Sequence, residues 1–160
     1  RKALFDEAVA LAGSGCYIDL TAFPVEDGED AWSATEGLQR YLASGAPADR
    51  VTISSDAGGC LPCFDAEGRV SRMEVGHSGA LLETLRDLLD EGMPLETALP
   101  ALTANPAPLL RRAGKGRVEA GADADLVALD ATGAAQTVII GGHIHVRDGQ
   151  AVRRGTFENR

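Results

Sequence analysis

The sequence has few of the features that bring a protein to nucleic acids or membranes. Lysine and arginine together number 15 against 24 aspartates and glutamates, which gives a formal net charge of −9 at pH 7. Nucleic acids and anionic lipid surfaces both attract clustered basic side chains. No apolar run has the length that a bilayer span needs, and no signal-peptide pattern opens the chain. We therefore expect no nucleic acid and no membrane among its partners.

Cysteine is scarce and odd in number. Cys16, Cys60 and Cys63 give no disulfide framework, which is typical of proteins from a reducing cytoplasm, so we expect a cytoplasmic location. Cys60 and Cys63 form a nominal C-x-x-C. A redox pair would open a helix after a strand, and a structural zinc site would need a second ligand pair. Pro62 favours a hairpin instead. A redox or zinc-binding role for Cys60 and Cys63 is kept as an alternative to this hairpin interpretation.

The residues that are present indicate a globular domain whose first residue falls inside an expected helix. Hydrophobic residues make up 44% and charged residues 24% of 160 residues. A free-standing chain of this length can bury about two-thirds of its unfolded surface. The chain begins with Arg1, inside an expected helix, so we expect a truncated segment.

Apolar spacing predicts alternating helices and strands up to residue 113. Helices are expected at 2–12, 31–43, 79–89, from Pro94 to Leu102, and from Thr103 or Asn105 to Arg112; strands are expected at 16–20 and 51–53, with a hairpin at 64–72. The acidic run in 23–30 is expected to be a solvated loop rather than a metal site. This order is that of a parallel α/β repeat.

The composition changes at 114–116, beyond which short strands are expected. They fall at 125–129, 136–140, 143–146 and 151–152. Gly141-Gly142 and Asp148-Gly149 are typical hairpin turns. We therefore divide the chain into 1–113, an α/β unit, and 114–160, the strands of a small β domain.

The stretch from Arg50 to Pro62 carries the candidate site. Its first part, 51–53, is β-branched and reads as a buried strand, and Asp56 follows almost at once. A carboxylate just past the C-terminal end of a strand lies where α/β barrels place their chemistry. Gly58 and Gly59 free the next segment to bend tightly and approach a ligand. The simpler alternative is that Ser54-Ser55-Asp56 only forms a turn or a helix cap.

Longer motifs resemble one branch of the amidohydrolase superfamily, the isoaspartyl (β-aspartyl) dipeptidases. The matching motifs are Ser54-Ser55-Asp56-Ala57-Gly58-Gly59-Cys60-Leu61-Pro62 with Phe64-Asp65 and Glu67-Gly68, then Thr103-Ala104-Asn105-Pro106-Ala107, Gly114-Lys115-Gly116, Gly121-Ala122-Asp123-Ala124-Asp125-Leu126-Val127 and Gly155-Thr156-Phe157-Glu158. The resemblance covers nearly all of this chain but only about the last two-fifths of such an enzyme. It implies the last β/α units of a (β/α)8 TIM barrel, followed by part of a small β-sandwich domain.

The resemblance also implies a chemistry. It is that of a binuclear zinc metallo-dipeptidase, in which a metal-bridging hydroxide attacks the β-linked amide of small isoaspartyl dipeptides. Asp56 matches the family's last-strand aspartate, a metal ligand that also takes up and returns the proton. The whole protein is expected to be a homo-oligomer.

Substrate contacts are expected at Gly58, Gly59 and Cys60. Cys60 stands where we expect relatives to carry a serine that contacts the substrate's carboxylate, and a thiol is the weaker donor. Backbone N–H groups of these three residues are the alternative anion contacts. Ala57 stands where we expect a glycine, a small departure that leaves Asp56 unaffected.

The other metal ligands of the family belong to earlier barrel strands, and nothing in this chain matches them. His143 and His145 form an H-x-H, yet the family's motif of that form closes the first barrel strand, so we interpret these two as polar positions in the β tail. His77 is expected to cap or flank a helix. We predict that this chain alone binds no stoichiometric zinc and hydrolyses no dipeptide, since one carboxylate cannot hold zinc.

Two alternatives stay open. The chain could come from another amidohydrolase, such as a dihydroorotase-like or hydantoinase-like cyclic amidase that shares the C-terminal pattern. It could also be a non-catalytic remnant or assembly subunit that keeps the fold without the metal. Substrate profiling and the presence of upstream metal-binding motifs distinguish these from the dipeptidase.

Overall fold

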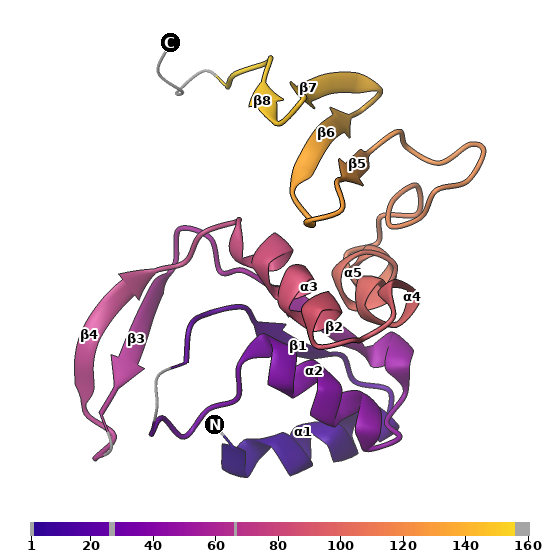
Figure 1. The fold of residues 1–160 in the computed structure, drawn as a ribbon. Helices are drawn as coiled ribbons and strands as arrows, with labels where there is room; N and C mark the ends of the chain where they lie inside the picture. Colours follow the sequence, from indigo (N-terminus) through magenta and orange to yellow (C-terminus); the bar gives the residue numbers. More distant parts are fainter. Residues whose placement is uncertain (1, 26–27, 66, 156–160) are drawn as a thin grey trace.

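The computed structural model describes residues 2–25, 28–65 and 67–155. Glu26 and Asp27 of the acidic run, Ala66 of the expected hairpin turn, and Thr156–Glu158 of the closing motif lie outside the described residues. The helices are α1 Lys2–Gly13, α2 Ala34–Ala43, α3 Ala80–Asp90, α4 Leu95–Ala98 and α5 Pro106–Leu109, with 3-10 turns η1 Ala48–Arg50 and η2 Leu99–Leu102 (Figure 1). The strands are β1 Ile18–Thr21, β2 Val51–Ser54, β3 Cys60–Phe64, β4 Val70–Val75, β5 Leu126–Leu129, β6 Ala135–Ile140, β7 His143–Arg147 and β8 Gln150–Ala151.

A parallel pair of strands lies at the centre of the α/β part. β1 pairs with β2 in a register that places Ile18 beside Val51 and Thr21 beside Ser54, and α2 connects the two strands. Because side chains alternate along a strand, one face of the pair is apolar and the other carries polar side chains. The apolar face packs against the helices, as the order of elements predicted.

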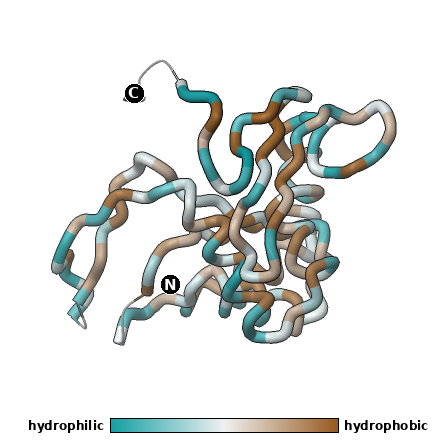
Figure 2. Tube along the Cα trace, turned by 45° about the horizontal axis from the view of Figure 1, so that its top comes forward, coloured by the Kyte–Doolittle hydropathy of each residue, from teal (hydrophilic) through white to brown (hydrophobic). Residues whose placement is uncertain are grey.

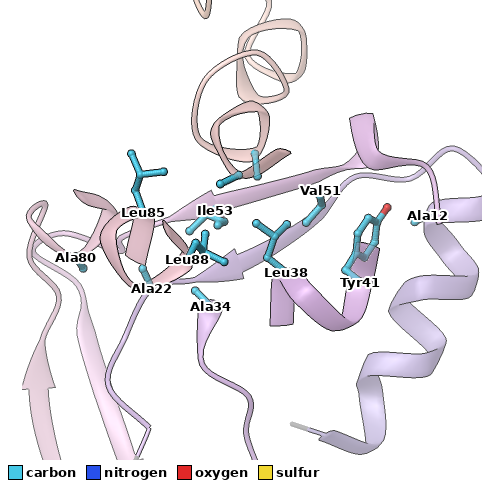
Figure 3. Close-up of a cluster of buried hydrophobic side chains, with 12 residues drawn as sticks. Ala12, Ala22, Ala34, Leu38, Tyr41, Val51, Ile53, Ala80, Leu85 and Leu88 are labelled. Carbon is cyan, nitrogen blue, oxygen red and sulfur yellow. The ribbon is translucent and has the colours of Figure 1, made fainter. Parts of the chain in front are cut away.

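The core is formed between that apolar face and helices α1, α2 and α3 (Figure 3). Ser33 caps α2, since its hydroxyl accepts a hydrogen bond from the N–H of Glu36 at 3.1 Å while the Glu36 carboxylate accepts one from the N–H of Ser33. Leu38, Tyr41 and Leu88 are almost fully buried. This packing fixes how β2 lies and therefore where its C-terminal end points.

The expected helices after Pro94 are shorter than predicted. The segment up to Leu102 is divided into α4 and η2, because Pro100 has no N–H to donate within a continuous helix. The prediction of a helix up to Arg112 was wrong: α5 ends at Leu109, and Arg111 has a left-handed φ of +55°. Asn105 lies at the N-cap position of α5, one of the two positions predicted, but its side chain makes no capping hydrogen bond and is instead buried against β2.

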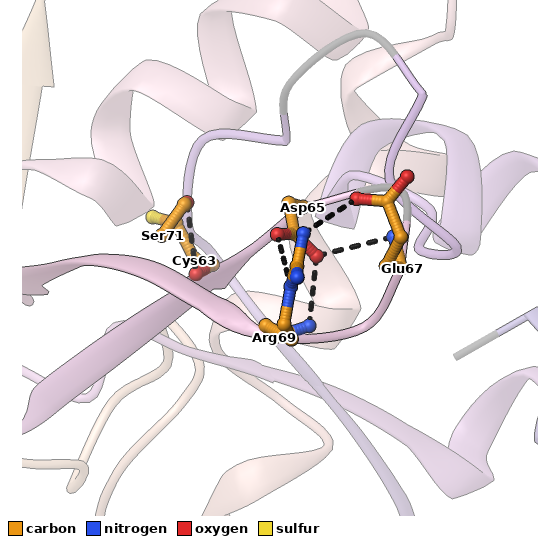
Figure 4. Close-up of polar contacts among 5 residues, drawn as sticks. All are labelled: Cys63, Asp65, Glu67, Arg69 and Ser71. Atoms are coloured by element: carbon orange, nitrogen blue, oxygen red, sulfur yellow. Dashed lines mark hydrogen bonds and ion pairs between the residues drawn. The ribbon is translucent and has the colours of Figure 1, made fainter.

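The hairpin β3–β4 is longer than the predicted 64–72 and projects from the body (Figure 1). Its turn is held by Asp65, whose carboxylate accepts hydrogen bonds from the N–H groups of Glu67 and Arg69 and from the Arg69 side chain (Figure 4). The Phe64 N–H donates to the Glu29 carboxylate at 3.1 Å, so the loop before α2 contacts the hairpin.

The C-terminal strands form one antiparallel sheet in the order β5-β6-β7-β8. Both predicted turns are confirmed, since Gly141 and Gly142 have φ of +56° and +79°, and Asp148 and Gly149 have +51° and +71°. Figure 2 shows hydrophobic segments in the helical body and along these strands. In the described part of the chain, no helix combines the length and apolar character that crossing a membrane requires.

Candidate active site

Asp56 follows β2 by two residues and its side chain is exposed, at the C-terminal end of the parallel pair. Its φ of +46° lies in the left-handed region. Aspartate tolerates this conformation better than most residues, because its short polar side chain can hydrogen-bond locally. Strained backbone of this kind gathers at functional sites. The chain thus presents a carboxylate where α/β barrels carry their chemistry.

A tight turn fixes the backbone of Asp56. The N–H of Gly59 donates to the Asp56 carbonyl at 2.8 Å, and Gly58 has a φ of +82°, the value that a type II turn requires at its third position. The glycine pair therefore bends the chain as predicted, with Gly58 at the left-handed corner.

Gly76, at the far end of the hairpin, clamps this turn. The N–H of Gly58 donates to the Gly76 carbonyl at 2.8 Å, and the N–H of Gly76 donates to the Gly59 carbonyl at 3.0 Å. A Cβ on Gly76 would lie 2.3 Å from the Asp56 carbonyl oxygen, so only glycine fits here. Sequence reasoning missed Gly76, because nothing local indicates that it contacts residues about twenty positions earlier.

Asp19 was missed as well. It lies on the polar face of β1, and its carboxylate accepts hydrogen bonds from the hydroxyls of Thr52 at 2.6 Å and Ser54 at 2.5 Å. The available signal was polar residues at alternate positions in two otherwise apolar strands. Without the register of the strands, that signal does not pair Asp19 with these hydroxyls.

The predicted substrate contacts adjoin Asp56 along the chain. Gly58 and Gly59 belong to the same turn, and Cys60 is exposed at the start of β3. The Gly58 N–H donates to the Gly76 carbonyl and the Gly59 N–H donates to the Asp56 carbonyl, so both groups are engaged rather than aimed at an anion. The contact of Cys60 with substrate stays a prediction.

Cys60 and Cys63 lie on opposite faces of β3, the first exposed and the second 5% exposed. Three steps along a strand separate their Cα atoms by about 10 Å. A disulfide needs about 7 Å or less. In this conformation the pair cannot form a disulfide.

The described residues contain no group of three or more His, Cys, Asp or Glu side chains that could hold a metal ion. Asp56 can supply one oxygen ligand, whereas zinc takes three or four protein ligands. His77 flanks α3, where its carbonyl accepts from the Ala80 N–H and its Nε2 lies 3.6 Å from Glu83 Oε2. His143 and His145 lie in β7, and Arg153 Nη2 lies 3.5 Å from His143 Nδ1.

Comparison with known proteins places the chain in a family. A sequence model described as the amidohydrolase family matches residues 14–149. The chain belongs to the amidohydrolase family. Its resemblance to β-aspartyl dipeptidases, predicted from the motifs around Asp56, is confirmed by solved structures.

Two structures of the β-aspartyl dipeptidase from Fervidobacterium islandicum AW-1 are similar to this chain. The complex with a β-Asp-Leu dipeptide has a TM-score of 0.83 and 32% sequence identity, and the match covers 98% of this chain. The second structure has a TM-score of 0.79 and 29% identity over 99% of this chain. The chain spans only 40% and 38% of the length of those two proteins.

A third structure, the N-acetylglucosamine-6-phosphate deacetylase from Pasteurella multocida, has a TM-score of 0.60 and 18% identity. The match covers 86% of this chain and 39% of that protein. At this identity the likeness concerns the fold alone, and it supports an amidohydrolase-like α/β fold.

Proposed function

We propose that the chain is the C-terminal segment of a zinc-dependent isoaspartyl dipeptidase. Residues 1–113 would complete a (β/α)8 barrel with strands from elsewhere, and 114–160 would supply strands to a small β-sandwich. The observation that carries the proposal is Asp56, an exposed carboxylate at the C-terminal end of a parallel strand within motifs similar to a β-aspartyl dipeptidase. A cytoplasmic location and a homo-oligomeric whole protein belong to the same proposal.

Asp56 would serve as a metal ligand and as the group that moves the proton. Zinc, held mostly by residues outside this chain, would lower the pKa of the attacking water toward neutrality. The Asp56 carboxylate accepts the proton of that water as the amide carbon is attacked. It then delivers the proton to the departing amine, acting first as general base and then as general acid. Cys60 would contact the substrate's carboxylate.

Replacement of Asp56 tests this role. In the full-length gene product, we expect Asp56→Asn to lower kcat for β-Asp-Leu by about 10²–10⁴-fold, the usual contribution of general acid–base catalysis. Asp49→Asn is the matched control, because this exposed carboxylate lies in η1, before β2 begins and away from the C-terminal end of that strand. An Asp56→Asn variant that keeps its zinc and most of its activity would contradict the proposal.

A substrate panel separates the dipeptidase from the cyclic amidases. β-Asp-Leu, α-Asp-Leu, dihydroorotate and hydantoin are compared at equal concentration with the full-length gene product. Hydrolysis of β-Asp-Leu alone is expected, whereas ring opening of the cyclic substrates would favour the other branch.

The isolated chain is expected to bind no stoichiometric zinc and to release no product from β-Asp-Leu. Titration calorimetry with zinc chloride measures the first, and an amine assay measures the second. Tight one-to-one zinc binding by residues 1–160 would falsify the claim that most ligands lie elsewhere.

A further inference from the structure

Asp19 stands out because both of its carboxylate oxygens accept hydrogen bonds from β2, the strand that leads to Asp56. Thr52 Oγ1 donates to one oxygen at 2.6 Å, and Ser54 Oγ donates to the other at 2.5 Å. Thr52 is buried and Ser54 half-buried. The proposed mechanism uses none of these three side chains.

The two hydroxyls lie on one face of β2, two residues apart, so a single carboxylate holds the last half of the strand in a fixed rotation. Hydrogen bonds to an ionised acceptor are shorter and stronger than those between neutral groups. The backbone of Ser54 is also tied to the end of β1, because its carbonyl accepts a hydrogen bond from the N–H of Ala22, the residue after that strand, at 2.7 Å. Ser54 is therefore held by both its side chain and its main chain.

What this anchoring governs is the path of the chain beyond β2. Only Ser55 separates Ser54 from Asp56, and Asp56 has its left-handed φ of +46°. On the other side, Gly76 clamps the turn that follows. The Asp56 carboxylate thus extends from a short span fixed at both ends, by Asp19 on the strand side and by Gly76 on the hairpin side.

We propose that Asp19 is a positioning residue for Asp56. By holding the hydroxyls of Thr52 and Ser54, it sets the direction in which β2 presents the Asp56 carboxylate to the reacting bond. The inference rests on the proposed role of Asp56. Displacement of a catalytic group by about 1 Å can cost about 10²-fold in rate, which is the scale of effect that such an anchor controls.

The test compares variants of the full-length gene product on β-Asp-Leu. We expect Asp19→Ala to lower kcat by about 10–100-fold with KM changed less than about twofold, because positioning acts on the reacting atoms rather than on binding. Asp19→Asn should recover most of the activity, since its Oδ1 still accepts from one hydroxyl and its Nδ2 donates to the other. The double variant Thr52→Val/Ser54→Ala should reproduce Asp19→Ala.

Three controls make each outcome decisive. Zinc content and melting temperature are measured for every variant, and Asp90→Ala, an exposed carboxylate at the end of α3, should leave kcat and KM unchanged. Ser54→Ala alone removes one of the two hydrogen bonds and should lower kcat by an intermediate amount. This variant tests the inference if Asp19→Ala does not fold.

Several results would overturn the inference. A lower melting temperature with unchanged kcat would make Asp19 purely structural. A raised KM that Asp19→Asn does not rescue would place Asp19 in contact with substrate, and loss of zinc would place it near the metal. An Asp56→Asn variant with near-normal activity would instead refute the proposed function, independently of what Asp19 does.

Discussion

Asp56 has a left-handed φ of +46°, and its carbonyl lies against the backbone of Gly76. Gly76 provides room for this contact, since its missing side chain allows the two backbones to meet. The φ of Gly76 is not in the left-handed region, so the requirement for glycine is one of space. The backbone that carries the proposed catalytic carboxylate therefore depends on a glycine at the far end of a hairpin.

We predict that Gly76→Ala lowers the free energy of unfolding by about 1–3 kcal/mol, the usual cost of overpacking. Urea denaturation of the full-length gene product measures this, with activity on β-Asp-Leu as a second readout. Gly13→Ala is the control, because no atom lies within 4 Å of the added Cβ at the end of α1. Equal stability of the two variants would show that the turn adjusts freely.

Asn105 is a second single residue that links distant segments of the chain. Its side-chain N–H groups donate to the carbonyls of Ala48 and Val51, both at 2.8 Å, and the residue is 6% exposed. It joins α5 to the beginning of β2. Without this amide, two carbonyls near the core would lose their donors.

Asn105→Ala is expected to lower the free energy of unfolding by about 1–3 kcal/mol, the cost of leaving buried polar groups unsatisfied. Asn105→Asp should be worse, because a carboxylate cannot donate to the two carbonyls and adds charge beside them. Chemical denaturation of the three proteins orders them. Asn105→Asp at wild-type stability would contradict the assignment.

At the scale of elements, the β5–β6 connection is held by one carboxylate. Asp130 accepts from the hydroxyl of Thr132 at 2.6 Å, from the N–H groups of Thr132 and Ala134, and from the amide of Gln136. The Thr132 hydroxyl, followed by the two backbone N–H groups, lowers the pKa of Asp130 from 3.8 to about 2. The charged form of Asp130 is therefore favoured in the folded state.

The sign of the linkage gives a pH prediction. A depressed pKa in the folded state contributes stability at pH values above the unfolded value, and this stability is lost as the pH falls toward 2. The melting temperature of Asp130→Asn should therefore lie below that of the wild type at pH 7. The gap should narrow between about pH 4 and pH 2. A gap that stays constant over that range would contradict the prediction.

Elements that depend on local sequence features could be predicted, whereas those that depend on contacts between distant residues could not. The helices at 2–12 and 79–89, the strand at 51–53 and both glycine-containing turns of the tail follow from local spacing and turn chemistry. The helix expected up to Arg112 failed, because short-range propensity does not register the left-handed φ of Arg111. The hairpin was predicted too short, since its pairing continues from Cys60 opposite Val75.

At the scale of the whole molecule, the α/β part leaves strand edges and apolar side chains uncovered. Among the described residues, β1 and β2 pair only with each other. The hairpin exposes a row of apolar side chains on one face, with Met73 57% and Val75 68% exposed. Free strand edges and exposed apolar patches favour association with other polypeptides.

We therefore expect the isolated chain to bind the dye ANS more strongly, per mole, than the full-length gene product does. Fluorescence titration measures this, and light scattering after gel filtration measures self-association. Met73→Ser/Val75→Ser should reduce both signals in the isolated chain, while Ser78→Ala, an exposed loop position, should not. Equal dye binding by the isolated chain and the full-length product would contradict the expectation.

The amino-acid sequence by itself determined the short-range features: the helical stripes, the buried strand before Asp56, the bend at Gly58 and the motifs of the amidohydrolase family. Only the tertiary structure decided which distant residues support that carboxylate. Asp19 meets Thr52 and Ser54, and Gly76 meets Asp56, because burial of the apolar faces sets how strands and hairpin pack. Local sequence propensity does not describe packing between distant segments, so these partners could be identified only from the folded structure.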